Sequence, residues 1–427
     1  MLVRNYHSLL TILICCLLLA SCSQDDSSGI VVPQQEEKDK SQEKGEEAEN
    51  DEGEDTSDED ESPESVLGSP YFTEELVWPA YPELTNKNFV YPTRDPFGKP
   101  IMLSATITMG REIGPDTPLR GFVLYNHYTI CRWNDCPTEG MLDMQHLLNA
   151  LLPGSGFAIV SADYYGFGQT ADSMQAYCLG SANARASIDA LLAARRLVAD
   201  EGYTWEDDLL NIGYSQGAQT SIAVLRLATE EYPDLHFTRT MAGGGPYDLE
   251  ETYHQYLTAG TAELPSAVIS ILMACNKYYR LGIARESMFK GRALDHLDEW
   301  VLSKQYSALE IDSKIGSHDI TTFIAPPLLD LSSSVSKAMM AALAKENLCQ
   351  GWTPRKDEDI MLLHNKSDEI APEVNTTRLY DFFKAQGLEN VELQKADYFS
   401  LGLSEHVGGA AMFLAIVGKW MREHYLK

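Results

Sequence analysis

One short segment constrains the fold of this chain more than any other. Residues 209–212 form an apolar run that leads into Gly213-Tyr214-Ser215-Gln216-Gly217, and the helix-like run 220–228 follows almost at once. A strand that turns so sharply into a helix exposes the serine hydroxyl at the end of a sheet, where a base can reach it. Side chains at the two glycines would collide with the neighbouring strand and helix. The motif alone is common by chance, so the remaining catalytic groups must be found elsewhere in the chain.

Strand-like and helix-like segments alternate on both sides of this turn. Short apolar runs typical of buried strands are followed by segments with apolar residues on one helical face. This alternation is typical of a mostly parallel sheet that is covered by helices on both faces. The expected strands are 101–109, 121–125, 157–162, 209–212, 237–242, 360–363 and 391–394, and the expected helices are 181–199, 220–228, 375–386 and 404–425. Residues 67–99, rich in aromatic residues and proline, are expected to form an arm packed on this 67–427 domain.

Between about residues 249 and 347 the alternation stops, and the sequence indicates helices at 267–281, 296–306 and 332–348. An insertion at this point of a parallel sheet lies over the carboxyl ends of the strands. We therefore expect a helical cap over the site at those ends. The alternative is that these helices only complete the fold and bury no part of a substrate.

A serine nucleophile needs a base within hydrogen-bond reach, and the base needs a carboxylate that fixes its tautomer. Asp368 follows the expected strand 360–363, and His406 follows the last expected strand. The order Ser…Asp…His is the one used with this kind of turn. All three residues are then expected at the carboxyl ends of strands, on one edge of the sheet.

Other residues compete for these roles. Glu369 could replace Asp368 as the acid, although the spacing after His364 favours Asp368. His364 itself could be the base, but its place at a strand end beside the acid favours a structural histidine. His406 could be an ordinary residue at the start of a helix, but its place after the last strand, where a base is required, favours the base. Asp163 is expected to tie down its own loop and to take no part in chemistry.

These motifs together resemble the α/β-hydrolases, and in particular the secretory lipase group. The resemblance extends from about residue 120 to the C-terminus and rests on 163–168, 213–217, 244–248, His364 with Asp368, and His406 before a run of small residues. It implies an α/β-hydrolase fold, a mostly parallel sheet flanked by helices with a helical cap insertion. It also implies that Ser215 is the nucleophile, Asp368 the acid and His406 the base.

An oxyanion hole should accompany this triad. One donor is expected to be the backbone N–H of Gln216, the residue after the nucleophile, and the second should come from the loop after 121–125. Resemblance to the family leads us to expect His-Gly-Thr in that loop, but this chain has His127-Tyr128-Thr129. The backbone N–H of Tyr128 can still donate, since only proline lacks it, and the tyrosine ring would then line or narrow the acyl pocket.

The function expected from these residues is that of a serine carboxylic ester hydrolase acting on a small-molecule or lipid ester through an acyl-enzyme. No cofactor is implied, and the chain has no Cys-x-x-Cys or His-Glu-x-x-His spacing that would indicate a metal site. One alternative is a serine peptidase of the same fold. Another is a non-catalytic, surface-displayed binding lipoprotein, although such proteins normally lose one of the three catalytic residues.

The N-terminus predicts export and lipid anchoring. Residues 1–22 combine Arg4 with an apolar run too short to span a bilayer, and they end in Leu19-Ala20-Ser21-Cys22. This ending resembles the lipobox of bacterial lipoproteins, which implies acylation of Cys22; the alternative is an ordinary secretory signal. Residues 24–26, Gln-Asp-Asp, resemble a short export signal of surface lipoproteins. We expect an anchor in the outer membrane or at the cell surface, and an anchor facing the periplasm remains the alternative.

Residues 23–66 predict a disordered acidic tether. They contain 18 acidic residues against three lysines, half of the net charge of −30 carried by the whole chain. A segment with so few apolar groups cannot bury enough surface to offset its ordering entropy. The acidic balance also argues against nucleic-acid binding, which requires a basic patch. The sequence gives no information on oligomeric state.

Five cysteines remain after the signal and the lipidation site are removed. They are Cys131, Cys136, Cys178, Cys275 and Cys349, an odd number in a compartment that permits disulfides. Cys131–Cys136 is the nearest pair, and Cys275–Cys349 is a second candidate if the region between them is a single insertion. We also expect that a Cys131–Cys136 bridge would stiffen the oxyanion loop.

Overall fold

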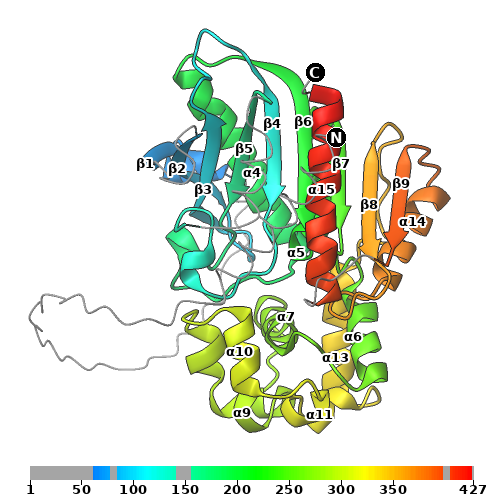
Figure 1. Cartoon of the computed structure of the whole chain (residues 1–427). Coiled ribbons are helices and arrows are strands. Elements are labelled where there is room, and N and C mark those ends of the chain that lie inside the picture. Colours follow the sequence, from blue (N-terminus) through cyan, green and yellow to red (C-terminus); the bar gives the residue numbers. More distant parts are fainter. Residues whose placement is uncertain (1–60, 77–83, 141–154, 398–403, 426–427) are drawn as a thin grey trace, which may run out of the picture. The chain divides into compact units, whose positions relative to one another are not determined.

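A single nine-stranded sheet organises the part of the chain that the computed structural model describes, which is residues 61–76, 84–140, 155–397 and 404–425. The strand order is β1-β2-β3-β5-β4-β6-β7-β8-β9 (Figure 1). The strands are β1 (Tyr71–Leu76), β2 (Leu84–Arg94), β3 (Pro100–Gly110), β4 (Leu119–Asn126), β5 (Phe157–Ala162), β6 (Trp205–Tyr214), β7 (Arg239–Gly243), β8 (Ile360–Asn365) and β9 (Val391–Ala396). The six strands from β5 to β9 along this order pair in parallel, whereas β1, β2 and β3 pair in antiparallel fashion.

This architecture confirms the expected α/β fold with a mostly parallel sheet. All seven strands predicted from 101 onwards are present at the expected places. The prediction of a packed arm at 67–99 was wrong in one respect, because this stretch supplies β1 and β2 and extends the sheet. Its side chains alternate between buried and half-buried over part of β2, and prolines interrupt it, so no continuous apolar run marked it as strand.

Helices cover both faces of the sheet. Alternate side chains of the strands face opposite ways: Phe122 and Leu124 of β4 belong to one apolar cluster, and Val123 and Tyr125 belong to another. The first cluster packs under α4, α5 and α14, and the second under α15. These helices are α4 (Gly180–Asp200), α5 (Gln216–Glu231), α14 (Val374–Ala385) and α15 (Glu405–Tyr425). Burial on both faces explains why the central strands are nearly continuous apolar runs.

The stretch between β7 and β8 forms a helical insertion, as predicted, with its own apolar cluster. Its helices are α6 (Leu249–Ala259), α7 (Pro265–Tyr278), α8 (Arg285–Met288), α9 (Gly291–Asp295), the π-helix η3 (Leu297–Leu302), α10 (Ala308–Ile315), α11 (Ile320–Phe323), α12 (Pro326–Leu329), α13 (Ser334–Leu343) and the 3₁₀ turn η4 (Ala344–Glu346). The expected helix at 296–306 is reduced to the short π-helix, and α6 and α10 were not predicted. Figure 1 shows the insertion beyond the ends to which the parallel strands point, near the first residues of α15.

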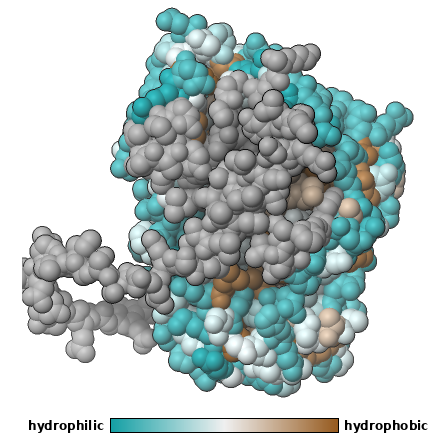
Figure 2. Space-filling model, in the orientation of Figure 1, coloured by the Kyte–Doolittle hydropathy of each residue, from teal (hydrophilic) through white to brown (hydrophobic). Residues whose placement is uncertain are grey.

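The insertion shares its apolar cluster with the sheet domain. Besides residues of α7 and α13, the cluster contains Cys131 and the loop residues Ala176, Tyr177, Cys178 and Leu179. On the face drawn in Figure 2 the insertion is mainly hydrophilic, with a hydrophobic strip over the position of α7, where the insertion borders the sheet domain. The apolar side of the insertion therefore faces the sheet domain.

None of the five cysteines outside the N-terminal segment forms a disulfide, so both proposed pairings were wrong. Cys131 packs in the cluster shared with the insertion, whereas Cys136 packs with Ile130 and Phe167. Cys275 lies inside the insertion's cluster, and Cys349 packs against the main core. Burial raises the pKa of the Cys131 thiol to about 12, so this side chain stays protonated as a small apolar group.

The folded unit begins at Ser62. Ser62 caps the short helix α2 (Pro63–Leu67), and Glu64 of this helix pairs with Arg196 of α4. The helix overlaps the last residues of the predicted tether. The predicted signal segment, Cys22 and the rest of the tether lie outside the described residues. Within the described ranges, none of the helices is long and apolar enough to cross a membrane.

Candidate active site

The strand β6 ends in the predicted sharp turn. Ser215 follows it with φ 57° and ψ −124°, a left-handed conformation that is strained for a residue with a side chain, and α5 begins at the next residue. A Cβ on Gly213 would lie 2.1 Å from the carbonyl oxygen of Gly217, and a Cβ on Gly217 would lie 2.0 Å from that of Asn126. Both glycines are therefore required for the contact between the turn, its helix and β4, as the sequence predicted.

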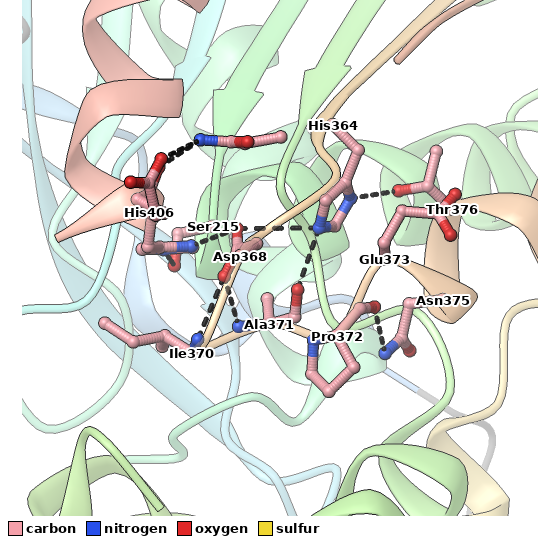
Figure 3. A network of polar contacts seen from close by, with 12 residues as sticks. Ser215, His364, Asp368, Ile370, Ala371, Pro372, Glu373, Asn375, Thr376 and His406 are labelled. Atoms are coloured by element: carbon pink, nitrogen blue, oxygen red, sulfur yellow. Dashed lines mark hydrogen bonds and ion pairs between the residues drawn. The ribbon is translucent and has the colours of Figure 1, made fainter. Parts of the chain in front are cut away.

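Ser215, His406 and Asp368 meet in one hydrogen-bonded chain (Figure 3). The Oγ of Ser215 lies 2.9 Å from Nε2 of His406, and Nδ1 of His406 lies 2.6 Å from Oδ2 of Asp368. The three side chains come from the ends of β6 and β8 and from the first turn of α15. All three residues are buried, and Ser215 keeps 8% of its surface exposed. The structure thus brings together the three residues that the sequence singled out.

The carboxylate of Asp368 is held from both sides. Its Oδ1 accepts the backbone N–H groups of Ile370 at 3.0 Å and Ala371 at 2.7 Å. Its Oδ2 lies 3.5 Å from Nε2 of His364, in addition to its contact with the base. His364 is fully buried, with Thr376 Oγ1 2.6 Å from its Nδ1 and the carbonyl oxygen of Ala371 2.8 Å from its Nε2. These contacts are those expected of a structural histidine.

Glu369, the alternative acid, has a different contact. Its Oε2 accepts the backbone N–H of His406 at 3.3 Å, and its charge adds a smaller influence than that of Asp368 to the raised pKa of the base. The neighbouring Glu405 is held by the side-chain amide of Asn365, at 2.9 Å to its carbonyl oxygen and 3.0 Å to its carboxylate. Asp368 alone among these carboxylates is placed against Nδ1 of the base.

The pair Asp368–His406 shifts both protonation equilibria. Burial by itself raises the pKa of Asp368, but attraction to His406 and hydrogen bonds from both histidines outweigh it and hold the pKa well below its usual range. Burial by itself lowers the pKa of His406, but the carboxylate outweighs it, so the pKa is raised above its ordinary value of 6.5. Asp368 is therefore ionised, and it makes His406 a stronger base.

The two expected oxyanion segments lie side by side. Gln216 is the first residue of α5, and the space that a Cβ on Gly217 would occupy is filled by the carbonyl oxygens of Asn126 and His127, at 2.0 and 2.9 Å. His127 is buried and stacks on Tyr164 at 4.1 Å, and burial lowers its pKa to about 3. Its neutral ring lies between two carbonyl oxygens, that of Tyr128 at 2.7 Å from Nδ1 and that of Asp163 at 3.3 Å from Nε2, next to the loop after β5.

A buried polar network under this site was not predicted from the sequence. Asn126, at the end of β4, donates to Asn211 of β6 at 2.8 Å and to Ser221 of α5 at 2.9 Å, and it accepts from Ser187 of α4 at 2.8 Å. Four elements are thus joined directly below the nucleophile turn. The available signal was an asparagine at a buried position in each of two apolar strands, which requires partners that only the fold reveals.

Asp163 ties down its loop, as expected. It is fully buried at the end of β5 and accepts hydrogen bonds from Ser104 at 2.5 Å and from the backbone and hydroxyl of Thr138 at 2.9 and 2.6 Å. Burial raises its pKa to about 6, although these hydrogen bonds oppose that rise. This carboxylate ties the loop after β5 to β3 and to the loop after β4, close to the expected oxyanion segment.

The insertion contacts the loops around the site at several points. Lys304 is buried and donates to the carbonyl oxygens of Gly166 at 2.6 Å, of Ser173 at 2.7 Å and of Ala171. The hydroxyl of Tyr256 in α6 donates to the carbonyl oxygen of Ile370, two residues after the acid. The insertion is therefore fastened to the loop after β5 and to the acid loop.

Comparisons with known proteins agree with this arrangement. The family model of the secretory lipases, described as "Secretory lipase", matches residues 139–425 of the chain. A solved hydrolase structure from Legionella pneumophila has a TM-score of 0.70 at 21% identity, covering 83% of this chain and 97% of that one. The structure of the rice cell wall degrading esterase LipA from Xanthomonas oryzae has a TM-score of 0.66 at 18% identity. The match covers 84% of this chain and 97% of LipA. The structure of Candida antarctica lipase A in its closed state has a TM-score of 0.55 at 16% identity, and the match covers 78% of this chain and 76% of that one.

At these identities the solved structures show the fold alone, which is the α/β-hydrolase fold. A search of the curated proteins found no match. The family model covers well over half of the sequence. The chain therefore belongs to the secretory lipase family, and it is a carboxylic ester hydrolase.

Proposed function

We propose that this hydrolase cleaves carboxylic esters through an acyl-enzyme on Ser215, with His406 as base and Asp368 as acid. His406 takes the hydroxyl proton while Ser215 Oγ bonds to the ester carbonyl carbon, and the carbonyl oxygen becomes an oxyanion. The carbon–oxygen bond to the alcohol then breaks, and His406 gives the proton to the departing alkoxide. A water molecule, deprotonated by the same histidine, attacks the acyl group and releases the carboxylic acid and the free serine.

The observation that carries this proposal is the geometry of the three side chains. The 2.9 Å and 2.6 Å contacts join these side chains at the carboxyl ends of the parallel strands, which supports their proposed roles as nucleophile, base and orienting carboxylate. The raised pKa of His406 suits it to accept the serine proton. The depressed pKa of Asp368 keeps a negative charge beside the imidazolium that forms during attack.

For the oxyanion hole we propose the backbone N–H groups of Gln216 and Tyr128. The first lies at the N-terminus of α5, where backbone donors lack intrahelical partners and the helix dipole favours negative charge. The segment of the second packs directly against the start of that helix. Tyr128 is half-buried and packs against Ile130 and Phe167, which supports a place for its ring at the wall of the acyl pocket.

The helical insertion, residues 249–347, is proposed to act as a cap over the site. This proposal is supported by the apolar cluster that the insertion shares with loops of the sheet domain and by the contacts of Lys304 and Tyr256.

We also propose that residues 1–22 are a lipoprotein signal and that Cys22 carries the lipid anchor. Residues from 23 to the folded unit would then form an acidic tether that holds the enzyme away from the membrane at the outer membrane or cell surface.

The test of the proposed function uses purified protein, an ester series of increasing acyl length, and Ser215→Ala. Loss of the hydroxyl should lower kcat at least ~10³-fold, because only binding and the oxyanion hole remain. Ser313→Ala, which changes an exposed serine of α10, is the matched control and should keep wild-type rates. Matched ester and anilide substrates separate an esterase from a serine peptidase. Equal ester hydrolysis by the wild type and Ser215→Ala would overturn the proposal.

A further inference from the structure

The residue immediately before the nucleophile contacts the base. Tyr214 is the last residue of β6, and only 2% of its surface is exposed. Its hydroxyl donates a hydrogen bond to the backbone carbonyl oxygen of His406 at 2.7 Å, and its ring lies 5.1 Å from the imidazole ring. The same ring packs on Phe413, about two turns further along α15, at 5.6 Å. Tyr214 therefore joins the strand that carries the nucleophile to the helix that carries the base.

Backbone contacts hold the base in place at the start of its helix. His406 is the second residue of α15, so its position depends on how that first turn is held. Its backbone N–H reaches Glu369 at 3.3 Å, a long contact, whereas its carbonyl oxygen receives the Tyr214 hydroxyl at 2.7 Å. The shorter of these two contacts comes from the covalent neighbour of Ser215.

Three glycines make room for the tyrosine ring. A Cβ on Gly243 would lie 2.9 Å from the ring, and one on Gly244 would lie 2.8 Å from its hydroxyl oxygen, both at the end of β7. A Cβ on Gly409, in α15, would lie 2.5 Å from the same oxygen. Distances this short are essentially never found for real Cβ atoms, so a side chain at any of these positions would force its neighbours, the tyrosine ring or hydroxyl among them, to move. The glycine-rich runs after β7 and after His406 are part of the family resemblance. In this structure these glycines leave the space that the Tyr214 ring occupies.

We propose that Tyr214 is a positioning residue for the base: its hydroxyl fixes the backbone of His406, and so sets the distance between His406 Nε2 and Ser215 Oγ. This inference rests on the proposed function of the triad. Because Tyr214 and Ser215 are adjacent in the chain, a single residue couples the nucleophile to the base. A displacement of about 1 Å between the base and the nucleophile can lower the rate by up to ~10²-fold. A buried hydrogen bond that holds the His406 carbonyl in place therefore protects the rate.

The test compares Tyr214→Phe with Tyr91→Phe. Tyr91 is also fully buried, and its hydroxyl also donates to a backbone carbonyl, that of Ala186 at 2.9 Å, without contact with the triad. Tyr214→Phe should lower kcat about tenfold with little change in KM, which is ~1.4 kcal/mol of transition-state stabilisation. Tyr91→Phe should lose a similar amount of stability and keep kcat within about twofold of the wild type. A purely structural role for Tyr214 predicts the same kcat for both variants.

A second variant pair tests the contact from the helix side. Replacing glycine by alanine inside a helix usually stabilises the helix by up to ~1 kcal/mol. In Gly409→Ala, however, the new Cβ would push the Tyr214 hydroxyl away. We expect Gly409→Ala to lower kcat in the wild type and to have no further effect on kcat in Tyr214→Phe, since the next ring atom is 3.6 Å from the new Cβ. Additive effects of the two changes would contradict the proposal.

The outcomes for the two proposals are distinguishable. If Ser215→Ala stays active, the proposed function fails. If Ser215→Ala is inactive and Tyr214→Phe behaves as Tyr91→Phe, only the positioning role of Tyr214 fails.

Discussion

The carboxylate of Asp368 determines how His406 works as a base. Its charge stabilises the imidazolium, and the pKa of His406 is therefore raised above 6.5. The unprotonated ring is the active form, so kcat/KM of the wild type should rise with pH along a limb whose midpoint lies above 6.5. The 2.6 Å contact between Asp368 and His406 should therefore be visible in the pH dependence of kcat/KM.

Asp368→Asn tests this coupling. Removing the charge takes away the main influence that raises the pKa of His406, so the remaining effect of burial should move the acid limb to lower pH. The rate should also fall by about 10⁴-fold, because the base loses the group that fixes its tautomer. Glu369→Gln is the matched comparison and should cause a much smaller shift and loss, since Glu369 contacts the backbone N–H of His406 and raises the pKa of its ring less than Asp368 does. A larger loss in Glu369→Gln than in Asp368→Asn would make Glu369 the acid.

Single residues differ in how well the sequence predicts them. Ser215, Asp368 and His406 were predictable because a motif and a fixed order of strand ends bring them together. Tyr214 and Asn126 were not, because their roles depend on partners 192 and 85 residues away in the chain. No local pattern encodes such contacts.

At the scale of elements, the predictable strands are those buried on both faces. β5 and β8 are buried at every position, and their apolar runs stand out in the sequence. β1 is the edge strand and β2 is its neighbour; both carry polar side chains and β2 contains a proline, so their sequence predicts an arm and not strands. The insertion has many helices of four to eight residues, too short for a helical period to be recognised, and its exact bounds were correspondingly poor.

One buried lysine, Lys304, contributes to the attachment of the insertion. Lys304 holds three backbone carbonyl groups of the loop after β5, and Lys304→Met would leave these acceptors without that donor. The free energy of unfolding, measured in urea, should fall by about 2–3 kcal/mol. Lys337→Met, which changes an exposed lysine of α13, should leave it within ~0.5 kcal/mol of the wild type. An equal effect of the two substitutions would show that the insertion is held by other contacts.

At the scale of the whole molecule, the proposed anchor and the catalytic domain should be separable. Cys22→Ser should release the protein from membranes, because the lipid supplies the binding energy of the anchor. The domain that begins at Ser62 should keep its kcat/KM for soluble esters, since the buried core residues and the proposed triad all follow Ser62 in the chain. Membrane fractionation and ester assays on the same preparations check both points. Membrane retention of Cys22→Ser would refute the anchor, and a loss of activity on release would refute the independence of the domain.

The central claim is that Ser215 becomes acylated during turnover. It is tested most directly by rapid acid quenching of the enzyme with an activated ester such as p-nitrophenyl butyrate, followed by peptide mass spectrometry and measurement of the released alcohol. We predict a burst of alcohol close to one equivalent of enzyme and a butyryl group on the peptide that contains Ser215, both absent in Ser215→Ala. An acyl group on another residue, or steady ester hydrolysis by Ser215→Ala, would contradict the account.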